Sequence, residues 1–103
     1  MSTQTKSDIK IKPKLNVPEP PLFKVIYMND NLTTVEFVIS SLVDHFDYTP
    51  DTAQNITMGI HDTGSAVVAV LPYEIAEQKG IEVTLEARNQ GYPLQVKIEA
   101  ESN

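Results

Sequence analysis

The segment from Leu22 to Phe46 constrains the fold most, because a strand pattern passes through a short polar turn into a helix pattern. β-branched and aromatic residues dominate Leu22 to Met28, and alternate positions share one face. The next three residues, 29–31, read Asn-Asp-Asn and favour a turn. Thr33 and Glu36 then form a capping-box pattern. The sequence therefore predicts a strand, a turn and an amphipathic helix that ends near Phe46.

Four more elements are predicted further along the chain. The triplet at 49–51 (Thr-Pro-Asp) places a cap, a first-turn proline and an acid at the start of a helix that ends near His61. Residues 65–71 form a continuous small-apolar run, which we expect to be a central strand. Residues 72–90 show three- and four-residue apolar spacing, typical of a helix that faces a sheet. Residues 94–98 alternate as a half-exposed last strand.

The predicted order is β-α-α-β-α-β, an α+β fold with three strands and three helices. A chain of 103 residues supports one domain. Residues 1–20 are rich in Ser, Thr, Lys and Pro, and such a segment cannot bury enough apolar surface to offset its ordering entropy. We therefore expect a flexible N-terminal tail over residues 1–20 and a core domain over residues 21–103.

Composition excludes several classes of function. The net charge is −6, and residues 1–20 carry +4 − 2 = +2, so the remainder carries −8. An acidic body repels phosphate backbones, and we expect no nucleic-acid partner. The chain has no cysteine, and no apolar run approaches membrane-spanning or signal-peptide character. We therefore expect no membrane partner, and a location in the cytoplasm or an equivalent reducing compartment.

Catalysis finds little support in the residues. Hydroxyl nucleophiles are the only ones present, and the possible bases are His45 and His61. His45 stands between two aspartates on a predicted solvated helix face, which is typical of a surface histidine. Nucleophile-elbow, phosphate-loop and metalloprotease patterns are all missing from the sequence. We expect no catalytic residue, no metal and no cofactor; a small hydrolase with His61 as its base remains a remote alternative.

Asn29, Asp30 and His61 indicate a different chemistry. An amide oxygen, a carboxylate and a neutral imidazole nitrogen are acceptors that can hold an ammonium group. Turn formation and a histidine at a helix C-terminus explain the same residues without any ligand, and the residues alone leave both readings open. The order and spacing of the Asn-Asp turn and of residues 58–61, Met-Gly-Ile-His, resemble the ClpS adaptor family from about residue 20 to residue 101.

The resemblance implies a ClpS-like fold with a three-stranded antiparallel-type sheet packed on three helices. It implies a protease adaptor that binds destabilising N-terminal residues (Leu, Phe, Tyr, Trp) and delivers their owners to a Clp unfoldase-protease. Asn29, Asp30 and His61 would bind the α-amino group of such an N-degron. The positions of the hydrophobic pocket and its gate would be Asn31, Thr33, Val35, Val38, Ser41, Thr57, Ile60 and Leu94. By pattern alone, the aliphatic members of this set are ordinary core residues.

The chain departs from the family pattern at several of these positions. Asn31 stands where the family usually has a second acid, which removes a negative charge near the ammonium. Val35 replaces a methionine that gates the pocket, so we expect a wider mouth and some tolerance for Ile or Val as the first residue. Ser41 and Thr57 predict a pocket more polar than usual.

A second surface is implied at residues 74–79, Glu-Ile-Ala-Glu-Gln-Lys, which are similar to the family motif E-V-A-E-T-K. Glu74, Glu77 and Lys79 would dock on the N-terminal domain of a ClpA- or ClpC-class AAA+ unfoldase, and the tail would reach the unfoldase channel. Without the resemblance this is a solvated helix face. The alternative function is a regulator that docks on the unfoldase without N-degron recognition.

Overall fold

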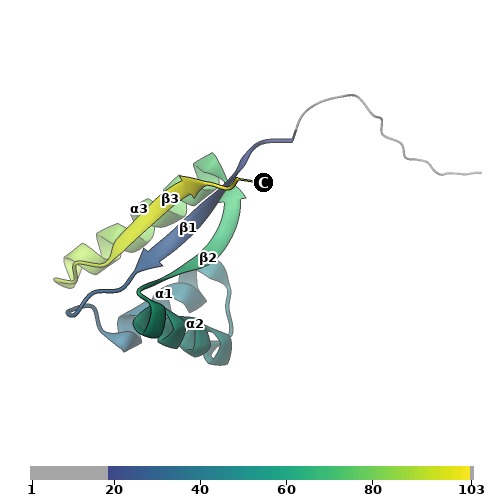
Figure 1. The fold of residues 1–103 in the computed structure, drawn as a ribbon. Coiled ribbons are helices and arrows are strands. Elements are labelled where there is room, and N and C mark those ends of the chain that lie inside the picture. The colour runs from purple at the N-terminus through teal and green to yellow at the C-terminus, as the bar shows by residue number, and fades with distance from the viewer. Residues whose placement is uncertain (1–18, 103) are drawn as a thin grey trace, which may run out of the picture.

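A computed structural model describes residues 19–102 (Figure 1). The elements follow in the order β1 (Leu22–Met28), α1 (Val35–Phe46), α2 (Pro50–Thr63), β2 (Ser65–Pro72), α3 (Tyr73–Asn89) and β3 (Gln95–Ala100). This confirms the predicted α+β order. The expected tail, apart from its last two residues, lies outside the described residues, so the boundary after residue 20 stays a prediction.

The three strands form one antiparallel sheet in the order β2-β1-β3. The central strand is therefore β1, and the prediction of a central strand at residues 65–71 is wrong, because β2 lies at an edge. Its register with β1 shifts between Val25 and Ile26, which pair with Ala69 and Val67. The intervening Val68 is only 1% exposed. Val68 is an extra residue in β2 that points into the core and interrupts the alternation of buried and exposed positions. This explains why the sequence of an edge strand shows a continuous apolar run.

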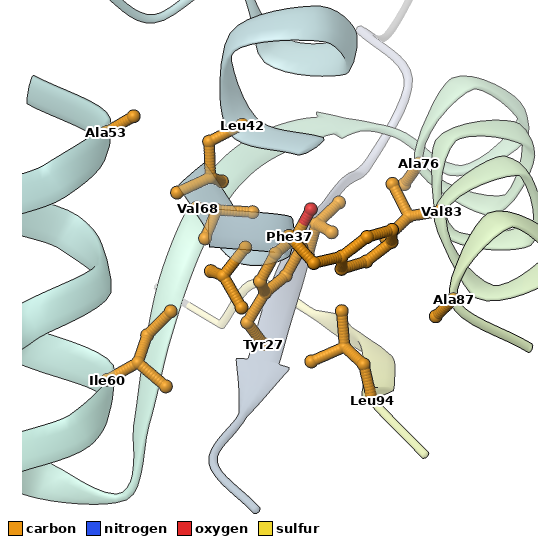
Figure 2. Close-up of a cluster of buried hydrophobic side chains, with 12 residues drawn as sticks. Tyr27, Phe37, Leu42, Ala53, Ile60, Val68, Ala76, Val83, Ala87 and Leu94 are labelled. Atoms are coloured by element: carbon orange, nitrogen blue, oxygen red, sulfur yellow. The ribbon is translucent and has the colours of Figure 1, made fainter. Parts of the chain in front are cut away.

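The core lies between the sheet and the helices, with side chains from every helix around Tyr27 of β1 (Figure 2). The phenol ring of Tyr27 is fully buried and contacts Phe46 edge-on, with ring centroids 6.2 Å apart. The buried cluster consists of Val25, Tyr27, Phe37, Val38, Leu42, Ala53, Ile60, Val68, Ala76, Val83, Ala87 and Leu94. The sheet and helices are thus held together around the strand that leads to the polar turn.

The helix starts are set by hydroxyl caps. The side chain of Thr34, not Thr33 as the capping-box pattern predicts, accepts from the backbone N–H of Phe37 at 3.1 Å. The predicted cap of α2 is confirmed, since Thr49 accepts from the backbone N–H of Thr52. That helix runs to Thr63, two residues beyond the expected end, and stops at Gly64 with φ of 97°.

Helix α3 faces the sheet through the small residues that its spacing predicted. Ala76, Gly80, Val83 and Ala87 are buried, whereas Tyr73 at its start is 46% exposed. A Cβ at Gly80 would lie 3.4 Å from Cδ1 of Ile98 on β3, so the glycine does bring α3 close to that strand.

Candidate functional site

A pocket of about 250 Å³ opens where β1 ends, between the polar turn and the two following helices. Nine residues from the turn, α1 and α2 line it: Asn29, Asp30, Asn31, Thr33, Val35, Val38, Thr57, Ile60 and His61. The structure therefore brings together all three residues predicted to bind an amino group and six of the eight predicted for the apolar pocket and its gate.

A backbone hydrogen bond sets the geometry of the polar rim. The N–H of Asn29 donates to the carbonyl oxygen of Gly64 at 2.9 Å, just beyond the β1–β2 pair of Met28 and Ser65. This bond fixes the turn against the last turn of α2, which carries His61. The side chains of Asn29 and His61 are both exposed and line the same pocket. Two acceptors distant in sequence thus lie on one rim.

Asp30 organises the turn. Its Oδ1 accepts from the backbone N–H groups of Leu32 and Thr33, at 2.8 and 2.7 Å, and its Oδ2 accepts from the Thr33 hydroxyl at 2.8 Å. Burial alone would raise the pKa of Asp30, but these bonds and the charge of Arg88 together hold it below its ordinary value. The carboxylate is therefore anionic at neutral pH. A carboxylate has about four acceptor positions, so capacity for a further donor remains.

The inner wall of the pocket is apolar. Val38 and Ile60 are buried, while Val35 at the start of α1 is 45% exposed. Thr57 is buried too, and its hydroxyl donates to the carbonyl oxygen of Ala53 in its own helix at 2.8 Å. Because that hydroxyl is already paired, Thr57 adds less polarity to the pocket than the sequence predicts.

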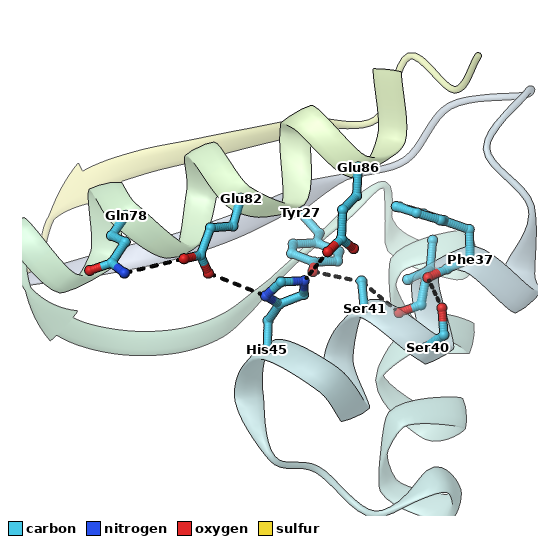
Figure 3. A network of polar contacts seen from close by, with 9 residues as sticks. Tyr27, Phe37, Ser40, Ser41, His45, Gln78, Glu82 and Glu86 are labelled. Carbon is cyan, nitrogen blue, oxygen red and sulfur yellow. Dashed lines mark hydrogen bonds and ion pairs between the residues drawn. The ribbon is translucent and has the colours of Figure 1, made fainter. Parts of the chain in front are cut away.

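Ser41 and Leu94 do not line the pocket. Leu94 is 2% exposed and belongs to the core. The Ser41 hydroxyl donates to the carbonyl oxygen of Val38 and lies 2.8 Å from the hydroxyl of Tyr27 (Figure 3). Burial raises the pKa of Tyr27, so its phenol stays protonated and can donate to Ser41. The predicted polar contribution of Ser41 to the pocket is therefore wrong, since its hydroxyl is used inside the fold.

The three predicted docking residues lie on α3, but on different sides of it. Glu74 lines a hollow with Pro20 and Pro21, whereas Glu77 lines a groove beside β3. Lys79 lines a third hollow that includes His45 at the end of α1. Glu77 also accepts from the Tyr73 hydroxyl at 3.0 Å. The helix presents these charges around its surface and not as one patch.

His45 occupies a position that the sequence did not predict. The solvated face expected for it is wrong, because its side chain is 13% exposed and lies between α1 and α3 (Figure 3). Its Nε2 is 3.0 Å from Glu86, and its Nδ1 is 3.4 Å from Glu82. Glu82 and Glu86 are four residues apart and therefore lie on one face of α3. This spacing is the sequence feature that could have indicated a partner for His45.

Two kinds of structural feature are absent from the part of the chain that the structure describes, a cluster of metal-ligating side chains and a membrane-spanning helix. Among residues 19–102, no group of three His, Cys, Asp or Glu side chains is placed to hold a metal ion. In the same range, every helix is too short or too polar to cross a bilayer.

Comparison with known proteins identifies the family. The family model described as "ATP-dependent Clp protease adaptor protein ClpS" matches residues 18–97. The chain belongs to the ClpS family. It is 42% identical over 98 residues to the ClpS adapter of Clostridium acetobutylicum, covering 95% of this chain and 97% of that protein. The ClpS adapter of Nitratidesulfovibrio vulgaris is 42% identical over 83 residues, or 81% of this chain and 83% of that one.

A solved ClpS structure supports the fold independently. Agrobacterium tumefaciens ClpS2 bound to L-phenylalaninamide superimposes with a TM-score of 0.78 at 40% sequence identity, covering 81% of this chain and 100% of that chain. The predicted ClpS-like fold is therefore confirmed. Membership of the ClpS family makes the chain an adaptor of the ATP-dependent Clp protease.

Proposed function

We propose that the pocket at the end of β1 binds the free α-amino group and first side chain of an N-degron. The chain then delivers the substrate protein that carries this N-degron to the Clp protease. The observation that carries this proposal is the rim on which Asn29 and His61 meet above an apolar wall. Binding and delivery need no bond-making residue, so the proposal includes no catalysis and no cofactor.

The rim suits an ammonium group. An ammonium has three N–H donors and needs acceptors on more than one side. Asn29 offers its amide oxygen, His61 offers a ring nitrogen, and Asp30 offers charge and its remaining acceptor position. Asp30 accepts three hydrogen bonds from Leu32 and Thr33 within the turn, whereas the side chains of Asn29 and His61 are exposed on the pocket rim. An acetylated N-terminus has lost its positive charge and two of its three N–H donors, so it fits this rim poorly.

The apolar wall suits a single large side chain. A pocket of about 250 Å³ lies below the usual size of sites for drug-sized ligands. Burying a Leu or Phe side chain there contributes about 1.5–3 kcal/mol. The ligand of the related ClpS2 is an amino-acid amide with an aromatic side chain, which supports a first-residue preference for Leu, Phe, Tyr and Trp.

Val35 is the residue at which this chain's selectivity differs from the family pattern. It is 45% exposed and lines the pocket at the start of α1. A short β-branched side chain there covers less of the opening than methionine, and this supports binding of Ile or Val as well. A Val35→Met variant should narrow the range of first residues to Leu and the aromatic ones.

Docking on a ClpA- or ClpC-class unfoldase through Glu74, Glu77 and Lys79 completes the proposal. Glu74 and Glu77 are exposed, which suits the rim of an interface. Because the three residues point to different sides of α3, a partner must wrap around the helix start to contact all of them. A cytoplasmic location, which a chain without cysteine fits, is part of the same proposal.

Fluorescence anisotropy of short labelled peptides tests the pocket. The peptides differ at the first residue (Phe, Leu, Trp, Ile, Val, Ala), and each is made with a free and an acetylated N-terminus. We expect binding of free Phe, Leu and Trp peptides, weaker binding of Ile and Val, and none after acetylation. Equal binding of acetylated peptides would reject the role of the rim. Failure of every peptide, with retained binding to the unfoldase, would favour the regulator alternative.

A further inference from the structure

An apolar groove of about 370 Å³ runs between α3 and β3 and shares no residue with the proposed peptide pocket. Ile81 and Leu85 of α3 line it together with Val96 and Ile98 of β3. Ile81 is 53% exposed and Leu85 is 60% exposed. Large aliphatic side chains that lie one turn apart on a helix and face solvent are typical of a contact surface.

The strand beside this groove has an open edge. Within residues 19–102, β3 pairs with β1 alone and forms one border of the sheet (Figure 1). The backbone N–H of Glu101, just after β3, donates to Leu22 of the central strand. The backbone groups of an antiparallel strand change sides at every residue. The even-numbered residues of β3 therefore direct their N–H and C=O groups outward, where a further strand can pair with them.

The opposite border of the sheet is less suited to pairing. There β2 contains the extra residue Val68, whose carbonyl oxygen already accepts from the Tyr48 hydroxyl at 2.6 Å. A bulge twists an edge strand and makes it a poor template for another strand. The pairing of β3 with β1 runs without a shift in register, so β3 is the edge to which an extended partner fits.

We propose that this partner is a second copy of the chain, which pairs its own β3 antiparallel to this one around a two-fold axis at Ile98. The two Ile98 residues then exchange N–H···O=C bonds, because their backbone groups point outward. Val96 and Ile98 face α3, so Lys97 and Glu99 lie on the other face of the sheet. On that face, Lys97 of each copy lies opposite Glu99 of the other.

Charge selects this register. A lysine on an edge strand commonly discourages pairing, and Lys97 alone would do so. Opposite charges at opposed positions stabilise an antiparallel pair, whereas like charges destabilise it. A two-fold axis at Lys97 would oppose two lysines, and an axis at Glu99 would oppose two glutamates. The axis at Ile98, which lies between them, is the one of the three that pairs unlike charges.

The same arrangement covers the groove. A Cβ at Gly80 would lie 3.4 Å from Cδ1 of Ile98, so α3 passes close to the axis. The two α3 helices then lie on one face of a continuous sheet, and their exposed Ile81 and Leu85 side chains approach each other. A two-fold contact of this kind buries the same patch on both copies.

Sedimentation equilibrium of the 103-residue chain tests the proposal at physiological salt, which screens its net charge of −6 and the Glu77 carboxylate at the groove. The mass should rise from 11.5 kDa towards twice that value between about 1 µM and about 1 mM protein. Lys97→Glu and Glu99→Lys should each keep the chain monomeric, because each opposes like charges. The double variant Lys97→Glu/Glu99→Lys opposes unlike charges again and should dimerise as the parent does.

A second pair of variants tests the groove. Leu85→Glu should prevent dimerisation, because it places a carboxylate between the two α3 helices. Met58→Glu is the matched control, since Met58 is 44% exposed on α2, outside the groove, and the variant should dimerise as the parent does. Circular dichroism checks that each variant is folded.

Three outcomes would overturn the proposal. A mass of one chain at every concentration means that the groove holds no second copy. A dimer that survives Lys97→Glu or Leu85→Glu in a folded variant is joined through another surface. A folded double variant that stays monomeric rules out the register around Ile98. None of these results depends on the proposed peptide pocket, so the two proposals can fail separately.

Discussion

The backbone N–H of Asn29 lies 2.9 Å from the carbonyl oxygen of Gly64 and donates a hydrogen bond to it. Through this bond the polar turn after β1 takes its position from the end of α2. Gly64 can end the helix there because its φ of 97° is open to glycine and costly for other residues. The relative placement of Asn29 and His61 therefore depends on one glycine that carries no functional group.

Gly64→Ala should destabilise the protein by roughly 1–2 kcal/mol, because an alanine must adopt the left-handed conformation. Among residues 19–102, no atom beyond the two chain neighbours of Gly64 lies within 4 Å of a Cβ added there, so the cost comes from the backbone and not from a clash. Gly59→Ala is the matched control: that helical position is equally open, and alanine should stabilise by about 0.5–1 kcal/mol there. Urea denaturation measures both. Equal effects of the two changes would contradict the prediction.

His61→Ala should weaken binding of a free Leu or Phe peptide by at least about 10-fold, since a lost hydrogen bond to a charged group costs about 1.5–3 kcal/mol. His45→Ala serves as the control, because His45 contacts Glu82 and Glu86 and does not line the pocket. Anisotropy titration of both variants gives the comparison. If only the His45 variant lost affinity for the peptide, the binding site would have to lie near His45, at the other side of α1.

Asp30→Asn should lower the free energy of unfolding by about 1 kcal/mol at pH 7, because a charged acceptor of three hydrogen bonds becomes neutral. The folded-state pKa of Asp30 is below its ordinary value of about 3.9. Its contribution is therefore complete above that value and is lost as the pH falls through the folded-state pKa. Urea unfolding should give a lower free energy of unfolding for the variant than for the parent at pH 7. Below pH 3 this difference in free energy should become smaller. The same difference in free energy of unfolding at both pH values would mean that the negative charge of Asp30 does not contribute to stability.

His45 and Glu86 should be energetically coupled by about 0.5–1 kcal/mol, as expected for a pair with one partner largely buried and the other half exposed. A double-mutant cycle with His45→Ala and Glu86→Ala measures this coupling in the free energy of unfolding. Strictly additive effects would mean that the contact in Figure 3 contributes no stability.

The order of the elements was predictable because local signals determine it. The capping residue Thr49 and the proline that follows it act within a few residues, and the structure confirms both, whereas α2 continues two residues past the expected end near His61. The start of α1 was predicted one residue early. Thr33 and Thr34 can both cap a helix. The Thr33 hydroxyl donates to Asp30, and the hydroxyl of Thr34 accepts from the backbone N–H of Phe37 and caps α1.

The pocket was predictable in composition but not in detail. Its members follow from the resemblance to the family and the order of motifs, whereas the direction of a hydroxyl depends on its neighbours in space. Ser41 is bonded to Val38 and faces Tyr27 from another element, and Thr57 bonds within its own helix. No local pattern reports such partners. The edge position of β2 escaped prediction for the same reason, since strand order is a long-range property.

The hydrogen bond from the backbone N–H of Glu101 to the carbonyl oxygen of Leu22 determines where the protein can be labelled or immobilised. Both ends of the described chain leave the fold at the start of β1, and the pocket lies past its far end, about seven residues or 20–25 Å along the strand. In Figure 1 the C-terminus lies at that first end. A dye or a solid support joined at either end of the described chain, next to residue 19 or residue 102, should therefore hold the molecule with its pocket facing outward.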